Sequence, residues 1–279
     1  MNPFTFIVLA LFAVGMNPAI ADIPSRVISL DYCADQFVLK LLPKERILAL
    51  STDSKKEFSY MRAHADGIPQ VRASIEDLLT LSPDMIIRSY GGAGNMTHFL
   101  NQVDIPLVQM PVSTPDIDSI RRSILFVASQ LGVPQRGEEV VAEMDRQLNR
   151  IAHTAKGGVA LYMTPTGYTG GSGTLIDDIF QAAGYQNLEA RAGWWPLPLE
   201  RLAYEQPDIV VAGFFDGQIS NPNQWSAMRH PIAKRQLSER PSVFINGAWL
   251  ACGGWFIVDA IAALAAAPEA RSGDDVSAQ

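Results

Sequence analysis

Aromatic rings and one arginine, gathered in a few loops, are the side chains of this sequence that are best suited to binding chemistry. Flat rings form semi-rigid walls, and each good ring contact contributes on the order of 1 kcal/mol beyond the area that it buries. Arg88 would suit an anionic group on a ligand, or it could pair with Asp84 or Asp31 inside the protein. Each ring could likewise belong to a hydrophobic core. The candidate binding residues are Tyr32, Tyr60, Arg88, Tyr90, Tyr168, Trp194, Trp195 and Trp249.

Patterns for catalysis and metal binding are weak. A metal-ion site needs three or four converging ligands, whereas the four histidines are scattered along the chain. We therefore expect no cofactor and no metal site, and we expect any metal to arrive inside its own chelator. Ser172 is the best candidate nucleophile, but a nucleophile elbow needs a glycine where Thr174 stands. An enzyme is not expected, and a secreted α/β hydrolase is kept as the alternative of another class.

Composition and charge exclude some classes of partner. The 279 residues include 22 Lys and Arg against 29 Asp and Glu, which gives a formal net charge of −7. Such a chain lacks the positive field that nucleic-acid binding requires. An apolar fraction of 48% is ordinary for a globular protein, and the length suits one or two domains.

The first 21 residues are typical of a signal peptide. Residues 4–14 are almost wholly apolar, and Ala19-Ile20-Ala21 matches the small-x-small site of a signal peptidase, which predicts cleavage before Asp22. The apolar run is shorter than the roughly 20 residues that span a bilayer. An uncleaved anchor or a buried helix is the alternative. The sequence thus predicts export to the periplasm, an oxidising compartment in which cysteines can pair.

A pattern that occurs twice, 124 residues apart, indicates how the chain is organised. Residues 75–87 and residues 199–211 each read as a short helix, a Pro-Asp stop and three apolar residues. Proline ends the helix because it lacks an N–H and restricts the residue before it. An apolar triplet without alternation suits a strand buried on both faces of a parallel sheet. Two copies of the motif imply two similar α/β lobes.

Strands and helices alternate along the chain, which indicates parallel sheets with helices outside them. Strands are expected at residues 27–30, 47–50, 85–87, 107–110, 159–163, 209–212 and 243–245. Between the halves, Val140, Met144, Leu148 and Ile151 share one helical face, which predicts a long helix from residue 137 to about residue 154.

The predicted fold class is therefore α/β, with two Rossmann-like lobes whose parallel sheets are joined by one long connector helix. A crossover helix inside one large domain is the alternative. The predicted segments are a signal peptide at 1–21, an N-terminal lobe at 22–112, an inter-lobe helical connector at 113–156, a C-terminal lobe at 157–268 and a disordered tail at 269–279.

The predicted lobes also place the ligand and the two cysteines. Ligands of parallel sheets sit beyond the carboxyl ends of the strands, and the candidate binding residues follow those ends. Cys33 and Cys252 fall in loops at the same edge, one in each half. If they form a disulfide, it ties the lobes together; free thiols and contact with the ligand remain open as alternatives.

In this order of elements, the chain resembles the class III periplasmic substrate-binding proteins of ATP-driven importers for ferric siderophores, haem and vitamin B12. The resemblance rests on residues 26–30, the two copies of the motif, Ser89-Tyr90-Gly91-Gly92, the connector and Gly247-Ala248-Trp249. It covers nearly all of the chain after residue 21, in the expected order. It implies two α/β lobes joined by one long helix, with the ligand bound between them.

The resemblance also implies a cargo and partners. The cargo would be an iron–siderophore complex, placed first, or cobalamin, with haem as an alternative within the same family. In that family one surface glutamate on each lobe docks into arginine pockets of the membrane permease, and the matching positions are Glu76 and Glu200. Each could instead only offset the partial charge at a helix N-terminus. The expected partners are an ABC permease and its ATPase subunits, and a monomer is expected.

Overall fold

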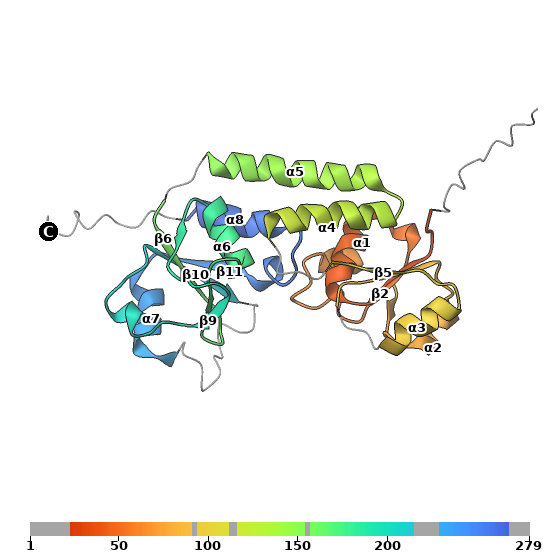
Figure 1. Cartoon of the computed structure of the whole chain (residues 1–279), viewed down its shortest axis with the longest axis horizontal. Coiled ribbons are helices and arrows are strands. Elements are labelled where there is room, and N and C mark those ends of the chain that lie inside the picture. Colours follow the sequence, from red (N-terminus) through yellow and green to blue (C-terminus); the bar gives the residue numbers. More distant parts are fainter. Residues whose placement is uncertain (1–22, 91–93, 112–115, 154–156, 215–228, 268–279) are drawn as a thin grey trace, which may run out of the picture.

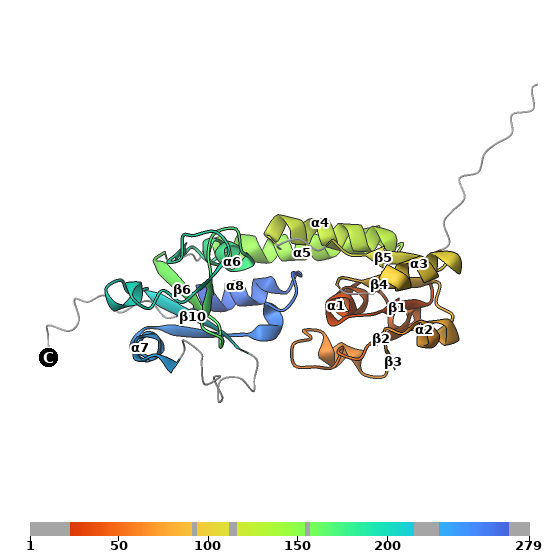
Figure 2. The same ribbon diagram turned by 60° about the horizontal axis from the view of Figure 1, so that its bottom comes forward.

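The computed structural model describes residues 23–90, 94–111, 116–153, 157–214 and 229–267, and it shows two α/β lobes bridged by helices (Figures 1 and 2). The predicted signal peptide, Gly91, Gly92 and the predicted tail lie outside the described residues. No helix within the described ranges has the length and hydropathy that a transmembrane span requires.

The N-terminal lobe is a parallel sheet of five strands, in the order β3-β2-β1-β4-β5. Its strands are β1 (Val27–Ser29), β2 (Ile47–Ser51), β3 (Gln70–Val71), β4 (Met85–Arg88) and β5 (Leu107–Gln109). Helix α1 (Tyr32–Leu41) packs on one face, and α2 (Ile75–Leu81) and α3 (Gly94–Gln102) pack on the other. Short 3-10 turns, η1 (Lys44–Arg46) and η2 (Arg62–Ala65), flank β2 and its loop.

The C-terminal lobe has a sheet of four parallel strands in the order β11-β10-β6-β8, and its first strand, β6, lies inside the sheet as β1 does in the N-terminal lobe. They are β6 (Val159–Met163), β8 (Gln186–Asn187), β10 (Ile209–Phe214) and β11 (Ser242–Asn246). An antiparallel pair, β7 (Tyr168–Gly170) and β9 (Trp194–Pro196), forms a separate small sheet. The remaining elements are α6 (Leu175–Ala182), α7 (Pro231–Glu239), α8 (Ile257–Ala265), η3 (Arg201–Ala203) and η5 (Gly247–Trp249).

The Pro-Asp pair of the repeated motif has the same role in both lobes. The Asp84 carboxylate accepts hydrogen bonds from the backbone N–H of Ser25 at 2.7 Å and of Arg26 at 3.0 Å, at the start of β1. The Asp208 carboxylate accepts one from Val159 N–H at 2.7 Å, at the start of β6. Each aspartate therefore fixes the motif strand, β4 or β10, beside the first strand of its lobe. The expectation of two similar α/β lobes is confirmed.

Two helices, rather than the connector alone, bridge the lobes. The connector is α5 (Pro134–Ala152), which begins three residues earlier than expected and runs along both lobes in Figure 1. A second helix, α4 (Ile117–Gln130), which the sequence analysis did not separate from the connector, packs against it. A side-chain carbon at Gly137 would lie 2.5 Å from the Ala128 methyl, so glycine allows this close packing of the two helices.

Helix α4 has one end on each lobe. Its first residue, Ile117, donates a backbone hydrogen bond to Asp178 of α6 at 2.9 Å, in the C-terminal lobe. Just past its last residue, the Leu131 carbonyl accepts a hydrogen bond from Arg46 of the N-terminal lobe at 2.7 Å. The chain therefore reaches the C-terminal lobe before α4, returns along α4 and crosses again along α5.

One hydrophobic core is continuous through both lobes and the bridging helices. It includes Phe37 of α1, Ile124 of α4, Met144 of α5 and Phe256 beside α8. The outer faces of the two sheets have separate, smaller cores. Because the shared core would have to be opened for the lobes to separate, we expect only limited movement of one lobe against the other.

Candidate functional site

The centre of the N-terminal sheet brings two predicted loops together. Strands β1 and β4 are neighbours, and the chain leaves them toward opposite sides of the sheet, so a crevice is expected beyond their carboxyl ends. Asp31 follows β1 and caps α1, accepting a hydrogen bond from Ala34 N–H at 2.9 Å. Its carboxylate also accepts the N–H of Ser89, which follows β4, at 2.6 Å. Asp31 thus holds the two loops side by side.

Three rings stand at this point and form what we call the N-terminal wall: Tyr32, Phe58 and Tyr90. The ring of Tyr32 lies edge-on to that of Phe58, with centroids 4.6 Å apart, and edge-on to that of Tyr90, with centroids 5.7 Å apart. Tyr90 is 45% exposed. The structure therefore brings together two predicted residues, and it adds Phe58, which the sequence analysis missed although it lies in the same loop as Tyr60.

Both tyrosines of the N-terminal wall are held in their neutral form. Burial raises the pKa of Tyr90, and the nearby carboxylates of Asp31 and Asp53 raise it further. Burial and the same two carboxylates also raise the pKa of Tyr32. The wall therefore consists of uncharged rings with negative charge beside them.

Rings of the C-terminal lobe lie on the β7–β9 pair, directly after the carboxyl end of β6. Tyr168 pairs with Pro196, and Gly170 pairs with Trp194. Because side chains alternate along a strand, Tyr168 and Trp194 lie on one face of this pair and Trp195 lies on the other. Tyr168 is 46% exposed and Trp194 is 52% exposed. We call Tyr168 and Trp194 the C-terminal wall.

Trp195 is held by polar neighbours on the opposite face. Its indole N–H donates to the Ala192 carbonyl at 2.9 Å, and the Arg191 guanidinium lies 4.3 Å from its ring centre. Arg191 pairs in turn with the buried carboxylate of Glu189 at 2.6 Å, and this hydrogen-bonded partner lowers the pKa of Glu189. The positive charge beside Trp195 is therefore already neutralised.

Tyr60 and Trp249 are part of the packing between elements rather than of either wall. The Tyr60 hydroxyl donates to Asp259 of the C-terminal lobe at 2.7 Å, and its ring stacks on Phe256 with centroids 4.4 Å apart. Burial, followed by this contact with the carboxylate, raises the pKa of Tyr60. Trp249, in η5, packs half-buried against the shared core.

A disulfide joins the lobes beside these contacts. Cys33 of α1 is bonded to Cys252, with 5.5 Å between the two Cα atoms. The bond lines a cavity of about 140 Å³ together with Phe37, Tyr90 and Ile120. This cavity reaches from the N-terminal wall toward α4. Because its volume is only about 140 Å³, it could accept only a small part of a large ligand.

Arg88 does not pair with either aspartate that the sequence analysis considered. Asp84 is occupied by the start of β1, and Asp31 by α1 and Ser89. Arg88 is buried instead, with hydrogen bonds to Gln109 and Thr97. Sequence reasoning missed these partners because they are neutral residues on other elements.

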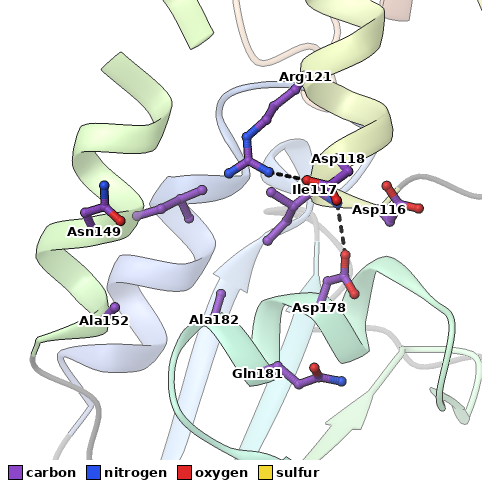
Figure 3. Close-up of a pocket in the computed structure, with 10 residues that line it drawn as sticks. Asp116, Ile117, Asp118, Arg121, Asn149, Ala152, Asp178, Gln181 and Ala182 are labelled. Atoms are coloured by element: carbon purple, nitrogen blue, oxygen red, sulfur yellow. Dashed lines mark hydrogen bonds and ion pairs between the residues drawn. The ribbon is translucent and has the colours of Figure 1, made fainter. Parts of the chain in front are cut away.

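A second cavity lies away from the aromatic walls. It holds about 560 Å³ between α4, α5 and α6, and it is lined by residues such as Ile117, Arg121, Asn149 and Gln181 (Figure 3). Arg121 is paired with both Asp118 and Asp145, and Asp178 accepts the backbone N–H of Ile117. Arg121 therefore joins α4 to α5, and the bond to Asp178 joins α4 to the C-terminal lobe.

Two further predictions concern the pair of surface glutamates and the binding of metal ions. Glu76, in the first turn of α2, and Glu200, just before η3, are exposed on different lobes. Among the residues that the structure describes, no group of three or more His, Cys, Asp or Glu is placed to hold a metal ion.

Comparisons with known proteins agree on this architecture. A vitamin B12-binding protein of Pectobacterium carotovorum subsp. carotovorum (strain PC1) is 25% identical over 204 residues, which cover 65% of this chain and 72% of that protein. The haem-binding protein HutB of Vibrio cholerae superposes with a TM-score of 0.68 at 18% identity, over 86% of this chain and 97% of HutB. The vitamin B12-binding protein BtuF of Vibrio cholerae superposes with a TM-score of 0.62 at 18% identity, over 87% of this chain and 96% of BtuF.

The structural likenesses show the fold, and the family is shown by the sequence. The family model described as "Periplasmic binding protein" matches residues 27–221, which include the N-terminal lobe from β1 on, the bridging helices and the C-terminal lobe as far as β10. The alternative of a secreted hydrolase receives no support from these comparisons. The chain therefore belongs to the periplasmic binding protein family, the substrate-binding proteins of ABC transporters, and it is a binding protein rather than an enzyme.

Proposed function

We propose that this protein captures a corrinoid of the vitamin B12 type in the periplasm and delivers it to the permease of an ABC importer. The observation that supports a large, flat cargo most directly is the exposure of Tyr90 on one lobe and of Tyr168 and Trp194 on the other. Clustered, exposed rings mark binding surfaces, because water solvates them poorly and a flat ligand can cover them.

Charge favours a corrinoid over the ferric siderophore that the sequence analysis placed first. Asp31 and Asp53 act on the rings of the N-terminal wall, and Arg191 beside the other hairpin face is paired with Glu189. At the wall itself, these carboxylates repel an anionic chelate stacked on the rings, whereas they do not repel a corrin ring with amide side chains. The relative from Pectobacterium, a vitamin B12-binding protein, supports the same choice.

The protonation state of Tyr32 and Tyr90 disfavours haem as the cargo. A tyrosine binds ferric haem as the phenolate, as in catalase. Burial and the neighbouring carboxylates raise the pKa of both Tyr32 and Tyr90, so the phenolate is harder to form at this wall. A corrinoid brings its metal already chelated and needs only ring contacts from the protein.

Delivery requires a contact with the permease, and we assign it to Glu76 and Glu200. Both are exposed, and they lie in corresponding copies of the repeated motif, one on each lobe. Two carboxylates held at a fixed separation can make two charge-assisted contacts with basic pockets on a partner. The permease would pass the cargo on with energy from its ATPase subunits, which hydrolyse ATP in the cytoplasm.

Equilibrium dialysis of the purified protein against three cargoes tests the proposal. We expect saturable, one-to-one retention of cyanocobalamin and much weaker retention of a ferric siderophore and of haem. Quenching of tryptophan fluorescence should follow the same order, with N-acetyltryptophanamide as the control for light absorbed by the ligand. Tight retention of a ferric siderophore or of haem, without retention of the corrinoid, would show that the assignment is wrong.

A further inference from the structure

Among the residues that the structure describes, no acidic side chain forms an ion pair with the buried cation of Arg88 in the N-terminal lobe. Arg88, the last residue of β4, is 8% exposed, and its hydrogen-bond partners are neutral. Its Nε donates to the Gln109 side-chain oxygen at 2.7 Å, and its Nη2 donates to the Thr97 hydroxyl at 3.0 Å. Its Nη1 is buried and has no hydrogen-bond partner in the described part of the chain. A buried guanidinium with an unused donor is costly, because neither water nor an anion compensates its charge.

The guanidinium lies at the N-terminal end of a helix. Thr97 is the fourth residue of α3, which begins at Gly94 and is nine residues long. The first backbone N–H groups of a helix have no partner inside the helix, and the helix dipole makes this end positive. Helix N-termini therefore attract anions. Here the positive helix end and the guanidinium of Arg88, which bonds Thr97 in the first turn of α3, lie close together and both attract negative charge.

This place lies at the same strand ends as the N-terminal wall. Gln109, which holds Arg88, also donates to the Ser89 carbonyl at 2.9 Å. Ser89 is bound to Asp31 and directly precedes Tyr90. The carboxylate of Asp31 forms no ion pair with Arg88, because its hydrogen bonds come from Ala34, Ser89 and Tyr90.

We propose that Arg88 and the first turn of α3 form a subsite that binds a phosphate group of the cargo. The corrinoids of the vitamin B12 type carry one phosphodiester, in the nucleotide loop that hangs from the corrin ring. Uncharged rings for the corrin and a single basic subsite for the phosphodiester together match a ligand of this class. The choice of a corrinoid rests on the proposed function, whereas the anion subsite is a property of this chain alone.

The affinities of two corrinoids together show how much the subsite contributes to binding. One is cobalamin, and the other is the same corrinoid without the nucleotide loop and its phosphodiester. We expect the wild-type protein to bind the first about 10- to 100-fold more tightly, as a charge-assisted hydrogen bond predicts. In Arg88→Gln this preference should fall to about one, with little change for the loop-free corrinoid. In Arg72→Gln, which removes an exposed arginine of the same lobe, the preference should stay.

The preference is a ratio measured on one protein sample, so partial unfolding of a variant cancels from it. If Arg88→Gln does not fold, Arg88→Lys keeps the charge but replaces the planar fork of donors with one ammonium group, and it should give an intermediate preference. An unchanged preference in a folded Arg88 variant would overturn the subsite and leave the proposed function intact.

Inorganic phosphate tests the subsite without any corrinoid. In the ¹⁵N-labelled protein, the Nε–H resonance of Arg88, identified by its loss in Arg88→Lys, should shift saturably with phosphate at constant ionic strength. The resonance of Arg72 should not shift. If no corrinoid binds but the Arg88 resonance shifts, the proposed function fails and the anion subsite stands. If the resonance does not respond to phosphate, the subsite is refuted.

Discussion

Replacing Asp35 with asparagine should make the stability of this protein less sensitive to a rise in pH through about 7. Asp35 lies in α1 and is completely buried. Its carboxyl accepts hydrogen bonds from the backbone N–H of Ser51 at 3.0 Å and from the Ser51 hydroxyl at 2.6 Å. Burial raises the pKa of Asp35 from 3.8 to about 7; the hydrogen bonds from Ser51 and Ser29 oppose this rise, and the neighbouring Asp31 adds to it.

The sign of the effect follows from the two pKa values. Because the folded-state pKa lies above the unfolded value of 3.8, the folded protein holds the proton more strongly. The stability that the neutral acid contributes is complete below the unfolded pKa and is lost as the pH rises through about 7. At 1.36 kcal/mol for each pKa unit, the whole loss is about 4 kcal/mol, of which about 2.5 kcal/mol falls between pH 5 and pH 8.

Urea unfolding of the wild type and of Asp35→Asn at a series of pH values measures this loss. Asparagine can accept the Ser51 N–H and donate to the Ser51 hydroxyl, and it does not ionise. The free energy of unfolding of Asp35→Asn relative to the wild type should therefore rise by about 2.5 kcal/mol from pH 5 to pH 8. Glu138→Gln, which removes an exposed carboxylate of α5, should run parallel to the wild type. Parallel curves for Asp35→Asn as well would refute the reasoning.

Three other perturbations have defined outcomes. Cys33→Ser, or reduction of the wild type, should lower the free energy of unfolding by up to about 5 kcal/mol, because the disulfide closes a loop across 219 residues; an unchanged urea midpoint would contradict this. Trp194→Ala should weaken corrinoid binding about tenfold and Trp195→Ala much less, because the two rings lie on opposite faces of the β7–β9 pair; equal losses in dialysis would argue against the assigned wall. Glu76→Ala combined with Glu200→Ala should leave the dissociation constant unchanged and abolish uptake in cells, and undiminished uptake would exclude the docking role.

The central strands could be predicted from the sequence because their signal is local. Buried strands of a parallel sheet read as short apolar runs, and the predicted strand at 159–163 coincides with β6. Helix α4 was not separated from the connector, although its start carries a readable signal. Asp116 and Ser119 form a capping box there, with each side chain bonded to the backbone of the other.

Much of the candidate site depends on contacts between distant parts of the chain. Tyr60 was predicted at a strand end and in a loop, but its hydroxyl bonds Asp259, 199 residues away. No local pattern distinguishes a ring that meets a ligand from one that meets the other lobe. The partners of Arg88 were missed for the same reason, since Thr97 and Gln109 come from a helix and a neighbouring strand.

The disulfide between Cys33 and Cys252 also has a consequence for how the protein matures. During synthesis, the first thiol must wait for 219 further residues before its partner exists. Throughout that interval it can form a mixed disulfide by exchange with a disulfide of another molecule. Within the chain, however, no alternative disulfide can form, because the sequence has only two cysteines and hence only one internal pairing. Oxidation can therefore be delayed or diverted to a foreign thiol, but it cannot produce a scrambled isomer.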